Sequence, residues 1–326
     1  MKRLSGFSFR SVSLQLCIII AFFFSAASAT KANKVAQSKP DEPSVIGRWD
    51  ITVSKNGKEV PSWLEVTLSG NSTLVGRFVA EGGSARPISE VHFKDGKMSF
   101  SIPKQWEHGD NDLIVEGILQ GDQLSGTLTE PDGKSYYWTA VRAPLLKRTA
   151  PPVWEAPIKL FNGKDLSGWH AEGDNQWQAV DGILRSPKSG SNIITDKTFT
   201  DFKLHIEFRY PKGSNSGVYL RGRYEAQIED SKGLEPDSHY IGGIYGFLNP
   251  NEMAAKDAGE WQAYDITLVG RLVTVILNGK TIISNQLIPG ITGGAINSKE
   301  GEPGPILLQG DHGPIEFRNI VITPAK

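Results

Sequence analysis

The chain has 326 residues, which is enough for two domains, and a formal net charge of −1 at pH 7. This nearly balanced charge gives no electrostatic basis for binding a polyanion, so a nucleic-acid partner is not expected. The composition, 39% apolar and 22% charged, fits a soluble globular protein, and 35 glycines and 19 prolines with few amphipathic helical runs favour an all-β fold rich in turns.

Residues 1–29 have the pattern of a secretory signal peptide. A basic region precedes a mostly apolar run over 12–27, which is short compared with the roughly 20 residues that span a bilayer. Ala-Ser-Ala ends at Ala29, so we expect cleavage there, a secreted or periplasmic protein, and no membrane attachment afterwards. Cys17 is the single cysteine and lies in this segment, so the mature chain should have neither disulfides nor thiolate ligands.

A small antiparallel β domain is predicted over 45–142, after a polar linker at 30–44. Turn sequences such as Asp95-Gly96 separate about eight strands in up-and-down order, one of them over 88–93. This pattern suggests a small barrel or sandwich of lipocalin-like shape. No catalytic cluster of residue types occurs in it, and a proline-rich linker at 143–157 sets the domain boundary.

The larger domain, 158–326, is also predicted to consist of strands. Residues 202–210 alternate strictly between apolar and polar side chains, as in a half-buried strand. Asn278-Gly279 is typical of a type I′ hairpin turn. A stretch at 231–260 shows no clear periodicity, and loops of that length in a compact domain are usually functional or disordered.

One stretch of this domain, 215–230, is predicted to be a single long strand. Apolar or small side chains fall on one of its faces, which suits a core. The other face is polar, and it forms either a solvated surface or the floor of a cleft. Gly217 and Gly222 favour the cleft, since glycine inside a strand often marks a close approach of ligand. The polar face carries Tyr219, Arg221, Arg223, Glu225, Gln227 and Glu229.

Five segments of the domain form a set with a defined order and spacing. They are LFNGKDLSGW at 160–169, NSGVYLRGRYEAQIED at 215–230, GEWQAYDI at 259–266, GPILLQGDHG at 304–313 and FRNI at 317–320. In this set the domain resembles the 3-keto-disaccharide hydrolase family, over roughly half of the chain. The resemblance implies a concanavalin A-like jelly roll of two curved antiparallel sheets and a carbohydrate substrate. The N-terminal β domain lies outside it.

The implied reaction starts from a sugar oxidised at C3, whose C2 proton is acidic because the carbanion is delocalised into the ketone. The C1 substituent then leaves by elimination, and water adds back across the enone. This route needs a base at C2, an acid at the leaving oxygen and donors to the enolate. From the resemblance we expect Glu225 as base or acid, Asp230 as a second acid, and His312 as a proton shuttle near neutral pH.

Substrate-binding roles follow from the same resemblance. Arg221 would hold the enolate or a hydroxyl, Gln227 would orient the substrate, and Tyr219 and Trp261 would stack on sugar faces. Gln309 belongs to the same segment as His312. No cofactor and no metal ligand is expected, although folds of this type can hold a divalent cation such as calcium. The sequence identifies no protein partner.

Two other functions fit the same residues. A retaining glycosidase would use Glu225 and Glu229, whose Cα atoms a strand places roughly 13 Å apart, whereas that chemistry needs carboxyl groups about 5–5.5 Å apart. Related glucanases carry Asp where this chain has Gln227. The other alternative is a carbohydrate-binding, lectin-like module without catalysis, because fold does not decide function. In such a module Tyr219, Tyr245 or Trp261 would stack on sugar faces for binding alone.

Overall fold

The structure is a computed structural model that describes residues 44–326. The expected signal peptide and nearly all of the first linker lie outside the described residues. All regular structure from residue 44 onward is β-strand, which confirms the all-β prediction, and no helix in that range could cross a membrane. The described residues belong to one compact unit, so the domain boundary at 143–157 stays a prediction.

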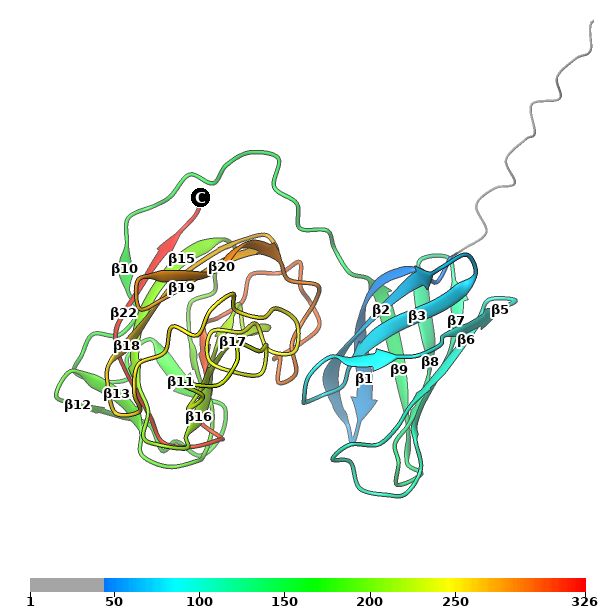
Figure 1. The fold of residues 1–326 in the computed structure, drawn as a ribbon, viewed down its shortest axis with the longest axis horizontal. Helices are drawn as coiled ribbons and strands as arrows, with labels where there is room; N and C mark the ends of the chain where they lie inside the picture. The colour runs from blue at the N-terminus through cyan, green and yellow to red at the C-terminus, as the bar shows by residue number, and fades with distance from the viewer. Residues whose placement is uncertain (1–43) are drawn as a thin grey trace, which may run out of the picture. The chain divides into compact units, whose positions relative to one another are not determined.

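Nine antiparallel strands form the N-terminal sheet, coloured blue to green in Figure 1. Their order is β4-β3-β2-β1-β9-β8-β7-β6-β5, so the chain runs up and down and the pairing of β1 with β9 joins its two halves. β4 also lies against β6, which curls the sheet around its apolar side. The strands are β1 (Gly47–Lys55), β2 (Lys58–Ser69), β3 (Thr73–Val79), β4 (Arg86–Ile88), β5 (His92–Lys94), β6 (Lys97–Ile102), β7 (Leu113–Gln120), β8 (Gln123–Thr129) and β9 (Ser135–Arg142).

The prediction of one strand over 88–93 is wrong, because these residues are divided between the end of β4 and the start of β5. These two strands lie at opposite ends of the strand order, so the chain crosses between them. Val91 lies in this crossing; its side chain is buried and its N–H donates to the carbonyl of Leu74 at 2.7 Å. A buried apolar residue and a paired amide therefore anchor the crossing without strand pairing.

Two further antiparallel sheets form a jelly-roll sandwich in the C-terminal half. One has the order β12-β13-β22-β15-β18-β19-β20, with β10 also paired to β22, and the other has the order β11-β14-β21-β16-β17. The strands are β10 (Ile158–Lys159), β11 (Trp169–Ala171), β12 (Gln178–Val180), β13 (Ile183–Ser186), β14 (Ile193–Thr195), β15 (Phe202–Arg209), β16 (Asn215–Leu220), β17 (Tyr224–Glu229), β18 (Gln262–Val269), β19 (Leu272–Leu277), β20 (Lys280–Leu287), β21 (Leu307–Leu308) and β22 (Ile315–Pro324).

The core of the sandwich follows from the alternation that the sequence shows. In β15 the even-numbered residues are fully buried and the odd-numbered ones are not, as predicted. Phe208 from this strand packs against Tyr264 of β18, with ring centroids 4.8 Å apart. Trp63 and Val79 of the N-terminal sheet belong to the same apolar cluster. The core therefore draws on residues from both parts of the chain.

The single long strand predicted at 215–230 is a hairpin of β16 and β17. Arg221 and Gly222 have left-handed backbone conformations, with φ of 56° and 64°, and they reverse the chain. Leu220 pairs with Tyr224 across this turn, so residues that face each other share the same parity in sequence. The predicted division into an apolar and a polar face therefore survives, and the polar side chains meet across two strands.

Candidate active site

A cavity of about 260 Å³ lies over the polar face of the β16–β17 hairpin. We call it the Glu225 cavity. Besides the hairpin, it is lined by the segment after β21, the loop after β20, the long loop before β18 and the turn after β3. The lining side chains that can bind a polar ligand or transfer a proton include Tyr219, Glu225, Gln227, Gln309, Asp311 and His312.

Glu225 lies at the floor of this cavity and is only 3% exposed. It faces Tyr219 across the hairpin, and Gly217 lies one pair further along, opposite Gln227. A Cβ atom at Gly217 would come within 2.3 Å of Oε1 of Glu225. Glycine is therefore required at this position, because it lets the carboxyl group lean over the neighbouring strand.

The environment of Glu225 moves its proton equilibrium into the neutral range. Burial raises the pKa of the Glu225 carboxyl from its ordinary value of 4.5 to about 8. The hydroxyl of Tyr219 and the charge of His312 oppose this rise, while the charge of Asp311 adds to it. At pH 7 the group is mainly a neutral carboxylic acid, which can donate a proton to a leaving oxygen.

Tyr219 connects this acid to the loop after β20. Its hydroxyl oxygen lies 2.9 Å from Oε2 of Glu225 and 3.0 Å from the carbonyl oxygen of Gly293. One hydroxyl has a single proton, so Tyr219 donates to one of these acceptors at a time. While Glu225 is protonated it can donate to the tyrosine oxygen, and Tyr219 then donates to Gly293. After ionisation, the tyrosine proton can turn to the carboxylate.

His312 and Asp311 form a second titrating pair on the cavity wall. Nδ1 of His312 lies 2.6 Å from Oδ1 of Asp311. This hydrogen bond raises the pKa of His312 above its ordinary value of 6.5. The imidazole ring is about half exposed, so it can exchange protons with solvent. Together with Glu225 it gives the cavity two ionisable groups whose pKa values lie above their ordinary values.

Gln309 and Gln227 supply amide groups to the same cavity. The Oε1 atom of Gln309 is buried and has no hydrogen-bond partner among residues 44–326. A buried acceptor without a partner is costly, so a ligand that donates a hydrogen bond there gains affinity. Oε1 of Gln227 accepts from the N–H of Ile228 at 3.0 Å, which leaves the amide NH₂ as the donor toward a ligand.

Arg221 does not have the role predicted from the sequence. It lies in the turn of the hairpin, its side chain is fully buried, and it is not part of the Glu225 cavity. Its guanidinium donates to the hydroxyl of Tyr224 at 2.9 Å and to the carbonyl of Gly270 at 3.0 Å. The left-handed turn at Arg221 and Gly222 takes this side chain off the polar face, and a structural role replaces the predicted substrate contact.

Asp230 and Trp261 also lie outside the cavity. Asp230 accepts a hydrogen bond from the N–H of Gly213 at 2.8 Å, which supports the loop before β16. Trp261 stacks with two arginines, since the guanidinium carbons of Arg209 and Arg318 lie 4.8 and 3.9 Å from its ring centroid. The predicted acid and the predicted stacking platform are thus placed in structural contacts.

Tyr245, expected from the sequence as a residue that stacks on sugar in a lectin-like module, lines the cavity. It comes from the long loop at 231–260, whose backbone runs along β17: the N–H of Tyr245 donates to the carbonyl of Glu225 at 3.0 Å. Gly82 and Gly83, from the turn after β3, also line the cavity and were not predicted. No local pattern in the sequence marks these two glycines.

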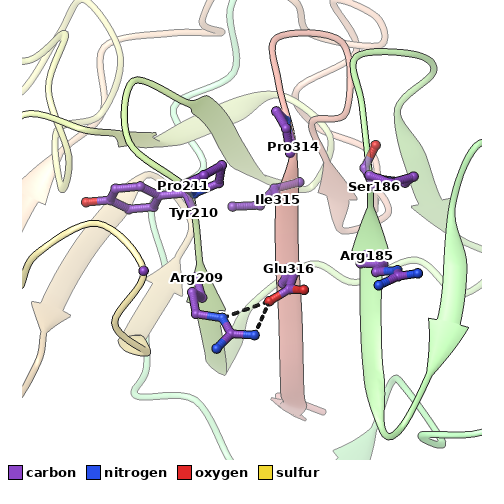
Figure 2. A pocket seen from close by; sticks show the side chains of 10 residues that line it. Arg185, Ser186, Arg209, Tyr210, Pro211, Pro314, Ile315 and Glu316 are labelled. Atoms are coloured by element: carbon purple, nitrogen blue, oxygen red, sulfur yellow. Dashed lines mark hydrogen bonds and ion pairs between the residues drawn. The ribbon is translucent and has the colours of Figure 1, made fainter.

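A second cavity, of about 400 Å³, is lined by residues of β13, β15 and β22 (Figure 2). Two of its charged groups are paired, since Nε of Arg209 lies 2.7 Å from Oε2 of Glu316, and the guanidinium of Arg185 donates to Oε1 of Gln178. Burial raises the pKa of Tyr210 to about 12, away from the neutral range. This cavity therefore lacks the titrating groups found beside Glu225.

Within residues 44–326, no group of three or more His, Cys, Asp and Glu side chains is placed to hold a metal ion. The expectation that no cofactor is needed, and the alternative of a calcium ion, both stay predictions.

Comparison with known proteins gives matches in the C-terminal half. Residues 156–323 match the sequence profile of the 3-keto-alpha-glucoside-1,2-lyase-like domain. A "3-keto-disaccharide hydrolase" of Bacteroides thetaiotaomicron is 24% identical over 170 residues, which cover 40% of this chain and 58% of the relative. The chain thus spans little more than half the length of that relative.

Solved structures with similar folds include two carbohydrate-related proteins. A candidate glycosyl hydrolase from Parabacteroides distasonis has a TM-score of 0.44 and 31% identity, over 54% of this chain and 92% of that one. The carbohydrate-binding module CBM66 from Bacillus subtilis has a TM-score of 0.36 and 13% identity, over 47% of this chain and 93% of that one.

Proposed function

Because the chain belongs to the 3-keto-alpha-glucoside-1,2-lyase-like domain family, we propose that it cleaves 3-keto-glycosides or 3-keto-disaccharides in the Glu225 cavity. The single observation that carries the proposal is the buried carboxyl group of Glu225, with a pKa of about 8, in one cavity with the His312–Asp311 pair. Acid–base elimination requires a proton donor and a proton acceptor in one site, and these two groups can supply them.

In the proposed elimination, neutral His312 takes the C2 proton of the 3-keto sugar, and the electron pair moves into the C3 carbonyl to form an enolate. The enolate then re-forms the ketone, a C1–C2 double bond appears, and the bond from C1 to the leaving oxygen breaks. Glu225 gives its proton to that oxygen. Water that adds its hydroxyl to C1 and a proton to C2 completes hydrolysis.

The remaining polar groups have binding roles in this proposal. The NH₂ of Gln227 donates to the C3 oxygen as negative charge develops there. The unpartnered Oε1 of Gln309 accepts a hydrogen bond from a sugar hydroxyl. Asp311 holds the imidazole of His312 through Nδ1, so Nε2 is the nitrogen that takes the proton.

A retaining glycosidase is the competing enzyme, and the cavity supports it less well. That mechanism needs a second carboxylate about 5–5.5 Å from the first. Glu229 does not line the cavity, and Asp311, the other carboxylate that does, is engaged by His312. The lectin-like alternative would use the same polar groups for binding alone.

The test is turnover by the mature protein, residues 30–326, with a 3-keto-disaccharide and with its unoxidised parent. Release of the leaving sugar from the keto form alone is the expected result. Release from the parent would indicate a retaining glycosidase, and sugar binding without any release would indicate a lectin-like module. An enone product would show that elimination is completed without hydration.

The Glu225→Gln variant tests the acid directly. Turnover of a 3-keto-disaccharide should fall at least about 100-fold, the lower range for an acid–base group, whereas a 3-keto-glycoside with a nitrophenol leaving group should lose less than about tenfold because it needs no proton. Glu229→Gln is the matched control on the same strand. Equal losses for both substrates would remove Glu225 from the acid role.

Export with cleavage after Ala29 is a separate part of the proposal and rests on the N-terminal sequence pattern.

A further inference from the structure

The turn between β3 and β4 contributes to a cavity that otherwise belongs to the sandwich. Gly82 and Gly83 line the Glu225 cavity together with Tyr219 and Gly293. The family match begins at residue 156, so this turn lies outside the part of the chain that defines the family. The cavity therefore has a wall that the family domain alone does not supply.

Backbone contacts hold this wall in place. The N–H of Gly294 donates to the carbonyl of Glu81 at 3.0 Å. A Cβ atom at Gly293 would come within 2.2 Å of the carbonyl oxygen of Gly83, so the two backbones touch. A Cβ atom at Gly290, in the loop after β20, would come within 2.2 Å of the buried indole of Trp63. The loop after β20 is thus held against the N-terminal sheet by this packing and against the turn by hydrogen bonding.

The position of the wall relates it to the leaving group. Gly293, which touches the turn, accepts a hydrogen bond from Tyr219, and Tyr219 contacts Glu225. In the proposed reaction Glu225 protonates the leaving oxygen. The turn at 81–84 thus lines the same cavity as this proton donor and is linked to it through Gly293 and Tyr219.

The surface that the turn offers consists of peptide groups and open space. A Cβ atom at Gly82 would meet nothing within 4 Å, whereas one at Gly83 would come within 2.2 Å of the ring of Trp106. In the described part of the chain, the N–H and C=O groups of Gly82 and Gly83 have no backbone or side-chain hydrogen-bond partner. Peptide groups of this kind can bond to hydroxyl groups, and the missing side chain at Gly82 leaves room for them.

We propose that the turn at 81–84 is the specificity wall for the leaving group, and that it selects a saccharide leaving group by hydrogen bonds from the peptide groups of Gly82 and Gly83 and by the space left at Gly82. This inference rests on the proposed function, because it assigns one part of the 3-keto-disaccharide to this wall.

The variant Gly82→Phe tests the wall, because the backbone there is not left-handed and the added side chain meets no neighbour. We expect the preference for a 3-keto-disaccharide over a methyl 3-keto-glycoside, as the ratio of the two kcat/KM values, to fall at least about tenfold, in the range that a sterically altered pocket gives. Gly301→Phe is the matched control, since Gly301 is exposed and its nearest neighbour, a carbon of Pro144, would be 3.8 Å away.

An unchanged ratio of kcat/KM values in Gly82→Phe would overturn the inference while leaving the role of Glu225 intact. If the wild type turned over no 3-keto-glycoside, the proposed function would fail. Calorimetric titration with an unoxidised disaccharide would then test whether the turn at 81–84 contacts a bound saccharide. Binding weakened at least tenfold by Gly82→Phe, but not by Gly301→Phe, would support it. Equal binding, or no binding by the wild type, would overturn it. Thermal unfolding of both variants checks that each is folded.

Discussion

The hydrogen bond between Tyr219 and Glu225 allows the acid to be tuned without removing it. In the wild type, kcat/KM should rise with pH as His312 loses its proton, above pH 6.5, and fall as Glu225 ionises near pH 8. Tyr219→Phe removes a donor that favours the ionised carboxylate. The pKa of Glu225 should therefore rise, and the falling limb of the profile should move to higher pH.

The size of this shift follows from the strength of the hydrogen bond. A hydrogen bond to a charged group contributes about 1.5–3 kcal/mol, and about 1.4 kcal/mol corresponds to one pKa unit. The falling limb should move up by about one unit or more, even if the variant loses affinity for its substrate. Because the phenyl ring keeps the packing, the comparison isolates the hydroxyl group.

The assay is kcat/KM for one 3-keto-disaccharide between pH 5.5 and pH 10, for wild type and Tyr219→Phe, with thermal unfolding measured at each pH. A falling limb that stays in place, or that moves to lower pH, would refute the reasoning. It would show either that the limb does not report Glu225 or that the hydroxyl does not stabilise its ionised form.

Two further predictions concern binding and stability. Gln309→Leu removes the unpartnered buried acceptor, so the affinity for the sugar should fall about tenfold while the melting temperature stays equal or rises; a lower melting temperature with unchanged affinity would contradict the binding role. Asp50 is buried next to Glu300, and burial, with that second negative charge, raises its pKa from 3.8 to about 9. The folded state therefore binds a proton that the unfolded state has lost over this range, so stability falls as pH rises from about 4 to about 9. Asp50→Asn lacks this titration, and its melting temperature relative to wild type should increase between pH 5 and pH 8.5; a constant difference would contradict the assignment.

The polar face at 215–230 shows why part of the site could be predicted from the sequence. A strand and a hairpin whose paired residues share parity give the same two faces, so Tyr219, Glu225 and Gln227 lie together although the predicted element was wrong. The prediction for Arg221 was wrong because two left-handed residues, Arg221 and Gly222, decide where the chain reverses, and alternation does not reveal them.

Contacts between segments that are distant in sequence account for the other differences between the predicted and the observed site. Trp261 is aromatic and lies within one of the five segments that carry the resemblance, but its arginine neighbours come from β15 and β22, and alternation cannot predict the register between these strands. The turn at Gly82 and Gly83 is an ordinary glycine-rich turn in sequence. It becomes part of a cavity only through packing against a loop some 200 positions later, and no local pattern encodes a contact of that range.

The position of Trp63 limits where this chain can be divided, because this residue of the N-terminal sheet packs in the sandwich. Its indole is fully buried in the apolar cluster of the sandwich, against Phe247 and close to Gly290. A shortened gene that encodes only the matched family region would leave this apolar surface open to water and remove one wall of the cavity. The N-terminal sheet therefore covers apolar surface of the sandwich, and we expect a chain cut near 143–157 to be less stable to heat than the full chain.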